Sequence, residues 1–531
     1  MKFKHKALIA FGMLILAAIY YYITLPAINI HSADFWNFII IVFAFVPVVY
    51  IIKKRMTLSE IRESKGIKVQ LGIVVALVLV FIIGAILSSP IINASKYQAL
   101  LTVEDGEFTE DIEELSYDQI PILDKASAEL LGDRQLGSMS DIVSQFEVDD
   151  IYTQINYQEK PVRVSPLEYA SAFKWFTNQS DGIPGYIMVD MTTEDTELVR
   201  LDEGIKYSES EYFNRNIYRH LRFNYPTYIF DDLSFEIDDD GVPYYVAPVK
   251  QFNIGLFGGV TIGKVVICNA ITGETTSYDV DEVPEWVDSV YSAELLTQLY
   301  DYYGTLKNGY INSILGQKDA IQTTSGANYL AIDNDVWVYT GVTSVTSDQS
   351  NIGFVLMNQR TMETKFYSVE GATEVSAMSS AEGMVQDLGY DSTFPLLLNI
   401  SGEPTYFVAL KDDAGLVKMY AMINVEKYQL VATGDTVSAC ESAYNTMLLN
   451  NGVTEEATDD REELTITGTI EDIAELVIEG NSHYYLILSN SNDIFDIVVE
   501  DYVDIIRYDI GDNITLEYKS SEIIHTVIGI Q

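Results

Sequence analysis

The chain contains few cysteines, few histidines and few basic residues. Its 531 residues include two cysteines, Cys268 and Cys440, which excludes a fold held by many disulfides and a zinc module built on several thiolates. Five scattered histidines argue against a His-based catalytic centre. Lys and Arg number 32 against 78 Asp and Glu, a formal charge of -46. We therefore expect no nucleic-acid partner, because phosphate binding requires clustered cations.

Sequence signatures of catalysis and nucleotide binding are also missing. Neither H-E-x-x-H nor G-x-S-x-G occurs. Residues 258–264 fit G-x-x-x-x-G-K, but Val265 stands where a phosphate-binding loop needs Ser or Thr, so we expect no nucleotide. These absences favour a non-catalytic role.

Three apolar runs near the N-terminus predict a membrane anchor. Residues 7–25, 36–52 and 73–92 are each about as long as a helix that crosses a ~30 Å hydrocarbon core. None of the three carries a charge, which argues against a pump or transporter. We interpret residues 1–92 as a three-span transmembrane anchor.

The basic residues predict the orientation of this anchor. Residues 1–71 hold nine basic and three acidic residues, whereas the rest of the chain holds 23 and 75. The basic residues lie at the N-terminus and in the loop 53–71, and the loop between the first two spans has none. Because basic loops stay in the cytoplasm, we predict a plasma-membrane protein with a cytoplasmic N-terminus. Residues from about 93 onward would then be extracytoplasmic.

An internal repeat occupies the exported region. Residues 265–275 and 354–364 align without a gap, and shorter echoes occur at 187–195 and 421–429. An apolar strand, an Asx turn and a second strand would explain each copy as a β-hairpin. The turn residues of the two main copies are Asn269, Thr272, Gly273 and Glu274, and Asn358, Thr361 and Glu363.

A second recurring element is Gly-x-Pro-x-Tyr, which begins at residues 182, 241 and 402. Helical patterns at 209–223 and 377–388 precede the later copies. A helix followed by an antiparallel meander, closed by VVICNAITGET, resembles the PepSY domain. The resemblance covers about residues 100–435 in four imperfect copies, although Asn269 replaces the usual Asp and only one copy has the full Thr-Gly-Glu ending. It implies binding or inhibition by a membrane-anchored, exported protein; an unrelated α+β fold with ordinary hairpins is the alternative.

The C-terminal region predicts a separate small module. Residues 451–461 are polar and acidic and are interpreted as a linker. Five short strands are expected at 464–470, 484–488, 494–499, 514–518 and 523–530, a pattern that resembles an OB-like β-barrel. The predicted fold class is thus α+β: an anchor at 1–92, an exported repeat domain at 93–450, the linker, and a small barrel at 462–531.

Two groups of residues are candidate ligand sites. Arg134, Arg215, Arg219 and Arg222 are cations in an acidic domain and could bind a carboxylate or phosphate; structural pairing with nearby Asp and Glu is the alternative. Asp238 and Asp240 occupy positions of a calcium loop, but Ala247 replaces its bidentate Glu. Weak Ca²⁺ binding and a simple Asx turn are both open there.

The sequence favours a non-catalytic scaffold, sensor or regulator of other envelope proteins. One alternative is an envelope hydrolase or transferase that uses paired carboxylates, and another is an accessory subunit of a membrane transporter. A groove lined by two carboxylates with raised pKa values would favour the enzyme, whereas a flat apolar patch would favour partner binding.

Overall fold

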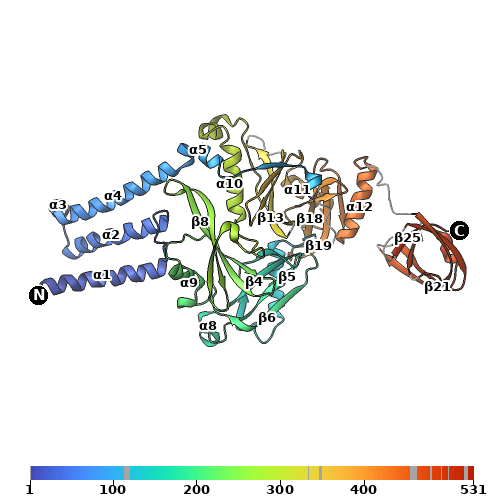
Figure 1. Cartoon of the computed structure of the whole chain (residues 1–531), viewed down its shortest axis with the longest axis horizontal. Coiled ribbons are helices and arrows are strands. Elements are labelled where there is room, and N and C mark those ends of the chain that lie inside the picture. The colour runs from blue at the N-terminus through green and yellow to red at the C-terminus, as the bar shows by residue number, and fades with distance from the viewer. Residues whose placement is uncertain are drawn as a thin grey trace. The chain divides into compact units, whose positions relative to one another are not determined.

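The computed structural model of the chain describes residues 2–112, 120–332, 334–345, 350–454, 463–478, 481–491, 493–499, 502–519 and 524–530. The chain divides into two compact units, Met1–Tyr444 and Asn445–Gln531. Both combine helices with antiparallel sheets (Figure 1). Most of the predicted linker at 451–461 lies outside the described residues.

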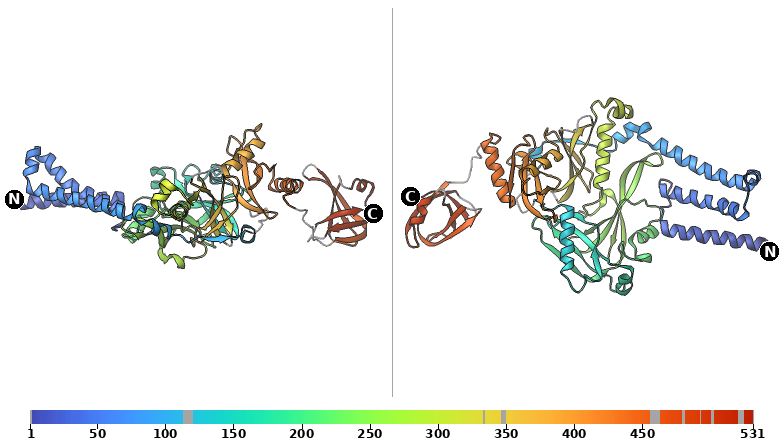
Figure 2. Two further views of the ribbon diagram at one scale, coloured as in Figure 1. Left: turned by 90° about the horizontal axis from the view of Figure 1, so that it is seen from above. Right: turned by 180° about the vertical axis from the view of Figure 1, so that it is seen from behind.

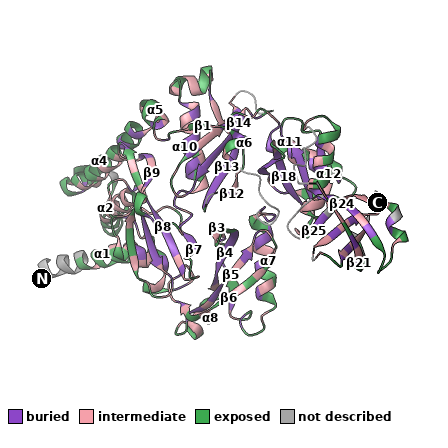
Figure 3. Cartoon of the chain, turned by 45° about the vertical axis from the view of Figure 1, so that its right-hand side comes forward, coloured by how far each residue is buried: buried purple, intermediate pink, exposed green. Residues whose placement is uncertain are grey.

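Two N-terminal helices are long and apolar enough to cross a membrane. They are α2 (Ala33–Lys54) and α4 (Lys65–Ser88), with hydropathies of 2.5 and 3.0. Their side chains are mostly not buried (Figure 3), as expected for surfaces solvated by lipid. The first predicted span falls in α1 (Lys2–Thr24), and the described part of that helix, Phe11–Thr24, is apolar. The three helices run alongside one another (Figure 2).

The boundaries of the third apolar run differ from the prediction. The loop between α2 and α4 contains the short helix α3 (Leu58–Glu63), and α4 already begins at Lys65, within the predicted loop. It ends at Ser88 because Ser89 and Pro90 start a new helix, α5 (Pro90–Gln98), with Pro at its first turn. The helix therefore extends into the charged loop 53–71, where hydropathy does not indicate the start of a helix.

Four mainly antiparallel sheets follow in the described part of the chain, and a helix precedes the consecutive strands of each. The first repeat has α7 (Lys125–Gly137), β2 (Phe146–Val148), β3 (Thr153–Tyr157), β4 (Lys160–Tyr169), α8 (Ala172–Asn178), β5 (Ile183–Asp190) and β6 (Thr196–Ile205). The second has α9 (Ile217–Asn224), β7 (Ser234–Ile237), β8 (Pro243–Ile254), β9 (Gly258–Asn269) and β10 (Thr275–Asp279). In both, the last three strands form a consecutive meander.

The third and fourth repeats keep the same order. The third has α10 (Ala293–Thr305), β11 (Ile321–Thr323), β12 (Asn328–Ile332), β13 (Asp335–Ser344), β14 (Gly353–Asn358) and β15 (Thr364–Tyr367). The upstream strand β1 (Glu104–Gly106) pairs in parallel with β15. The fourth has α11 (Glu374–Met384), β16 (Asp391–Ser392), β17 (Leu396–Ile400), β18 (Glu403–Lys411), β19 (Val417–Asn424) and β20 (Val431–Gly434). The strands are largely buried (Figure 3).

Side-chain caps shift two helices from their predicted positions. The stretch 209–223 is helical only from Ile217, because the Asn216 side chain accepts a hydrogen bond from the Arg219 amide and fixes the start there. The second predicted helix begins earlier than expected, at Glu374, where Thr373 caps it in the same way. It ends at Met384 rather than at 388.

The closing hairpins of three repeats share one turn geometry. Asn269 Oδ1 accepts hydrogen bonds from the amides two and three residues later, and Asn358 and Asp190 do the same. The fifth turn residue has a positive φ in each: 76° at Gly273, 66° at Met362 and 65° at Glu194. These three hairpins are therefore the same unit. The fourth, at Asn424, is longer, and its backbone amide bonds to Leu430 O.

The Gly-x-Pro-x-Tyr elements form another shared feature. Gly182, Gly241 and Gly402 have φ values of 84°, 77° and 77°, a conformation that glycine adopts without steric cost. The three tyrosines that follow, Tyr186, Tyr245 and Tyr406, are fully buried.

The second unit contains five strands that pair in a ring: β21 (Glu463–Ile478), β22 (Asn481–Leu488), β23 (Ile494–Val498), β25 (Ile524–Ile530) and β24 (Asn513–Lys519). Only the β23–β25 pairing is parallel. Strand β21 is longer than predicted because an irregularity after Ile470 lets its first half pair with β24 and its second half with β22. The interior is apolar around Phe495.

Candidate functional site

A cavity of about 290 Å³ lies where the first three repeats meet. Strands β3 and β4, strand β7 with the loop before it, and the start of α10 contribute to its walls. The lining is mainly polar and includes both signs of charge. Its residues are Lys125, Asp150, Ile151, Tyr152, Thr153, Gln154, Arg163, Asp232, Leu233, Ser234, Ser289, Ser292, Tyr329 and Gln359.

Arg163 is the unusual member of this lining. It lies on β4 opposite Gln154 of β3 and is only 5% exposed. One terminal nitrogen donates to Gln154 Oε1 (3.0 Å), the other is 3.5 Å from Tyr152 O, and Nε has no hydrogen-bond partner. The guanidinium carbon lies 5.9 Å from the centre of the Tyr329 ring.

No carboxylate of the described residues pairs with Arg163 within 4.0 Å. Burial lowers the pKa of Arg163, but a guanidinium stays protonated in proteins. Arg163 is therefore a buried positive charge that no carboxylate of the described residues contacts, although Asp124 and Glu129 act on it at longer range. The second cation of the lining, Lys125, donates to Asp150 O (3.0 Å).

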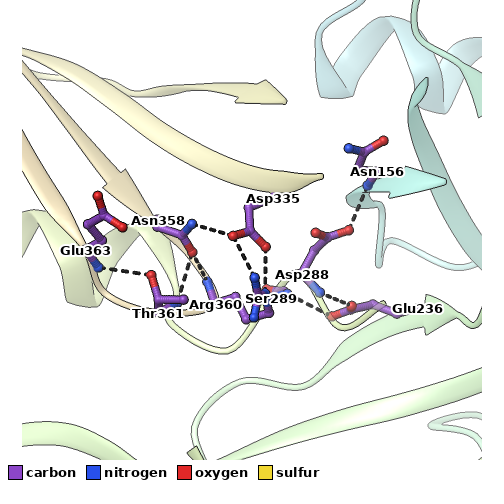
Figure 4. A network of polar contacts seen from close by, with 9 residues as sticks. All are labelled: Asn156, Glu236, Asp288, Ser289, Asp335, Asn358, Arg360, Thr361 and Glu363. Atoms are coloured by element: carbon purple, nitrogen blue, oxygen red, sulfur yellow. Dashed lines mark hydrogen bonds and ion pairs between the residues drawn. The ribbon is translucent and has the colours of Figure 1, made fainter. Parts of the chain in front are cut away.

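A network of buried carboxylates supports one wall of the cavity (Figure 4). Glu236 of β7 is fully buried and accepts hydrogen bonds from the Asp288 amide (2.8 Å), the Ser289 amide (3.2 Å) and the Ser234 hydroxyl (2.7 Å). Asp288 in turn accepts from the Asn156 amide (2.7 Å). Burial raises the pKa values of Glu236 and Asp288, and their mutual repulsion adds to the rise for Asp288. These contacts tie the first repeat to the second.

The turn of the third repeat meets the same region. Asn358, predicted as a turn residue, also donates from Nδ2 to Asp335 Oδ2 (2.7 Å), and Arg360 forms a bidentate pair with Asp335 (2.6 and 2.8 Å) (Figure 4). The intervening Gln359 lines the cavity and is hydrogen-bonded to Tyr291. Local turn geometry thus presents Gln359 to the cavity.

A second cavity, of about 380 Å³, is acidic. Glu168, Glu209 and Glu211 line it. Burial and neighbouring carboxylates raise the pKa of Glu168 to about 7, and burial also raises the pKa values of the other two. Glu209 accepts a hydrogen bond from Tyr218, while Glu211 accepts from Tyr169 and Trp175.

The predicted arginines do not form one anion site. Arg134 lies on α7, whereas Arg215 and α9 residues Arg219 and Arg222 belong to the second repeat. Arg215 donates to Gln179 O (2.6 Å), and Arg222 donates to Leu25 O (2.9 Å). Arg219 stacks on Tyr22 at 4.9 Å and also lines the acidic cavity. The partners of these arginines are mainly backbone carbonyls and rings rather than the expected carboxylates.

The structure gives Asp238 and Asp240 a turn role. Asp238 Oδ1 accepts hydrogen bonds from the Asp240 amide (3.1 Å) and the Val242 amide (2.9 Å), and Glu236, two residues before Asp238, is fully buried. Within the described ranges, no three His, Cys, Asp or Glu side chains are grouped as a metal site would require.

The apolar N-terminal helices contact the second repeat directly. The β8–β9 hairpin places Leu256 and Phe257 at the end of α4, where both amides donate to Ser88 Oγ (2.8 and 3.1 Å). Tyr97 donates to Ser88 O (2.6 Å). A Cβ on Gly258 would lie 2.3 Å from Ser88 O, so this approach requires glycine.

The segment after α1 adds further contacts. Its Ile28 amide donates to Pro226 O (2.7 Å), and His31 Nδ1 lies 2.8 Å from Leu256 O.

No protein-family model matches the chain, and no curated protein matches it. What the chain does must therefore follow from its own residues.

Proposed function

We propose that this chain is a membrane-anchored extracytoplasmic sensor or regulator of other envelope proteins, without catalytic activity of its own. Three N-terminal helices would cross the plasma membrane with the N-terminus in the cytoplasm. The loop 53–71 would be cytoplasmic, and residues from about 93 would lie outside. The segregation of basic residues into 1–71 supports this orientation.

One observation carries this proposal: the second repeat is hydrogen-bonded to the end of α4 through Ser88. A domain that is merely tethered to the membrane needs no specific hydrogen bonds to its anchor. The buried hydroxyl of Ser88 accepts hydrogen bonds from two backbone amides of the hairpin, and the absence of a side chain at Gly258 lets the strand come this close. Together these contacts fix one position of the hairpin relative to the helix. Such a joint can transmit a change in the repeats to the membrane helices.

The repeat architecture supports a binding role. Four units that each begin with a helix and contain one mainly antiparallel sheet, three of them with the same closing turn, are consistent with PepSY-like repeats over about residues 100–435. The ring of strands in the second unit, with its one parallel pair, supports an OB-like module at 462–531. Both resemblances imply recognition rather than chemistry.

Hydrogen exchange of the full chain in lipid nanodiscs tests the joint. Ser88→Val removes the acceptor of the Leu256 and Phe257 amides, and we expect faster exchange at the hairpin tip and in the membrane-proximal helix α5. Ser89→Val is the matched control, because the Ser89 hydroxyl is exposed and bonds only to Ile86 O. Equal exchange in the Ser88 and Ser89 variants would contradict a coupling role.

The acidic cavity favours an envelope hydrolase as a second candidate. Glu168, with a pKa of about 7, has the protonation behaviour of a general acid, and Glu209 and Glu211 are nearby carboxylates. If the cavity is catalytic, a panel of fluorogenic glycosides and esters should reveal hydrolysis by wild type that Glu168→Gln abolishes. Absence of turnover across the panel would leave the sensor proposal as the better account.

A further inference from the structure

We propose that the cavity around Arg163 binds the carboxylate of a small zwitterionic molecule, an amino acid or a short peptide. This inference deepens the sensor proposal by naming a ligand class. It rests on the geometry of the cavity rather than on the membrane joint.

The first step is the missing counter-ion. An unpaired ion buried in a protein costs several kcal/mol, so natural proteins pair such charges. Asp124 and Glu129 act on Arg163 at longer range, but Asp124 is paired with Lys411 and caps α7, and Glu129 is paired with Lys125. No carboxylate in the described part of the chain forms an ion pair with Arg163, and an anion in the adjoining cavity would.

The second step is the direction of the hydrogen bonds. Arg163 Nε and Gln154 Nε2 are both buried donors without acceptors, and they belong to directly paired residues of β3 and β4. Gln154 Oε1 already accepts a hydrogen bond from Arg163, so the Nε2 donor of the same amide group points away from that bond. Two unused hydrogen-bond donors on neighbouring residues, one of them part of the Arg163 cation itself, match a group that only accepts hydrogen bonds, as carboxylates and phosphates do.

The third step selects the carboxylate. Asp150 and Asp232 also line the cavity, so its four ionisable Lys, Arg and Asp side chains sum to zero charge. These acids would repel a phosphate dianion, whereas they could pair with the ammonium group of a zwitterion. A volume of about 290 Å³ is at the lower end of small-molecule pockets, which suits an amino acid or a dipeptide.

Thermal unfolding of the full chain in mild detergent tests the site with four probes. They are a mixture of the twenty amino acids, a mixture of Gly-X dipeptides, the same dipeptides as C-terminal amides, and inorganic phosphate. We expect one of the first two to raise the unfolding temperature by several degrees at millimolar concentration. The amides and phosphate should not. An equal rise with the amides, a rise with phosphate alone, or none with any probe would overturn the proposal.

Arg163→Met separates a binding role from a structural one. Because the variant removes an unpaired charge while keeping an apolar stem, its unfolding temperature without probe should equal or exceed that of wild type, and the probe-induced rise should vanish. Arg200→Met on β6 of the same sheet, where the arginine pairs with exposed Asp141, should keep the rise. A rise that persists in Arg163→Met would overturn the assignment.

A milder variant covers the case in which Arg163→Met fails to fold. Gln154→Leu keeps the charge and removes only the amide donor, and we expect it to weaken binding of the effective probe about tenfold, as measured by calorimetry. Unchanged affinity would overturn the site. A bound carboxylate with no effect of Ser88→Val on exchange would refute the membrane coupling while leaving this binding site intact.

Discussion

Gly273→Ala is the sharpest perturbation of the repeat turns. Gly273 has a φ of 76°, and a Cβ placed there would lie 2.2 Å from Cζ of Tyr207. The substitution therefore adds two separable costs: a left-handed backbone conformation in a residue with a side chain, and a steric conflict with a ring. Both arise in one tight turn whose hydrogen bonds hold its shape.

The size of the effect follows from these two terms. A left-handed residue other than glycine costs about 1–2 kcal/mol, and overpacking of a filled site costs about 1–3 kcal/mol. We expect a total loss of about 3 kcal/mol. At roughly 2–4 °C per kcal/mol for domains of this size, the unfolding temperature should fall by about 6–12 °C.

The assay is thermal unfolding of the full chain in detergent, followed by near-ultraviolet circular dichroism. The Tyr207→Ala variant lacks the ring, and Gly273→Ala is measured both in wild type and in this variant. In that background Gly273→Ala should cost only the backbone term, about 1–2 kcal/mol. Equal losses in the two backgrounds would show that the ring does not limit the site. No loss in either would show that φ at 273 is not positive, and the shared turn geometry would be refuted.

Other predictions follow from the same features. At Met362, where φ is also positive, glycine should be less destabilising than alanine by about 1 kcal/mol in the same unfolding assay, the reverse of the order in an ordinary strand. Burial raises the pKa values of Asp288 and Glu236, so their contribution to stability is complete below about pH 4 and is lost as pH rises through the folded pKa values. Asp288→Asn should therefore lessen the fall in unfolding temperature between pH 5 and 9. A membrane-impermeant maleimide should label Ser277→Cys but not Ser59→Cys in intact cells, and the reverse pattern would contradict the orientation. The buried native thiols, whose pKa values burial raises to about 12, should stay unlabelled.

The features that sequence could predict are those whose causes are local. An Asn followed by Thr three residues later specifies the turn because its side chain bonds to amides within the same five residues. The two long apolar helices α2 and α4 could also be predicted, since length and composition alone indicate a helix able to cross a membrane. Boundaries set by caps, as at Asn216 and Thr373, were missed because hydropathy does not register them.

The features that sequence could not predict depend on distant residues. Arg163 was overlooked, although an arginine between Val162 and Val164 in the strand Lys160–Tyr169 was a signal. Its importance becomes visible only because Tyr329 of the third repeat packs over it and no carboxylate does. Likewise Arg222 looked like a ligand-binding cation, but its acceptors include Leu25 O, almost two hundred residues earlier in the chain.

The arrangement of the repeats links the cavity to helix α4 by a short path. Ser234 lines the cavity, and its strand β7 pairs with β8 through Ser234 and Val246. Strand β8 continues, through a register shift after Val249, toward the hairpin tip that bonds to Ser88 of α4. A ligand shifts the N-terminal helices only if it binds more tightly to one of two arrangements of these strands. Because the cavity is lined by Arg163 of the first repeat and Tyr329 of the third, a ligand that contacts both walls would favour the arrangement that brings the repeats together, and the middle repeat would transfer that preference to α4.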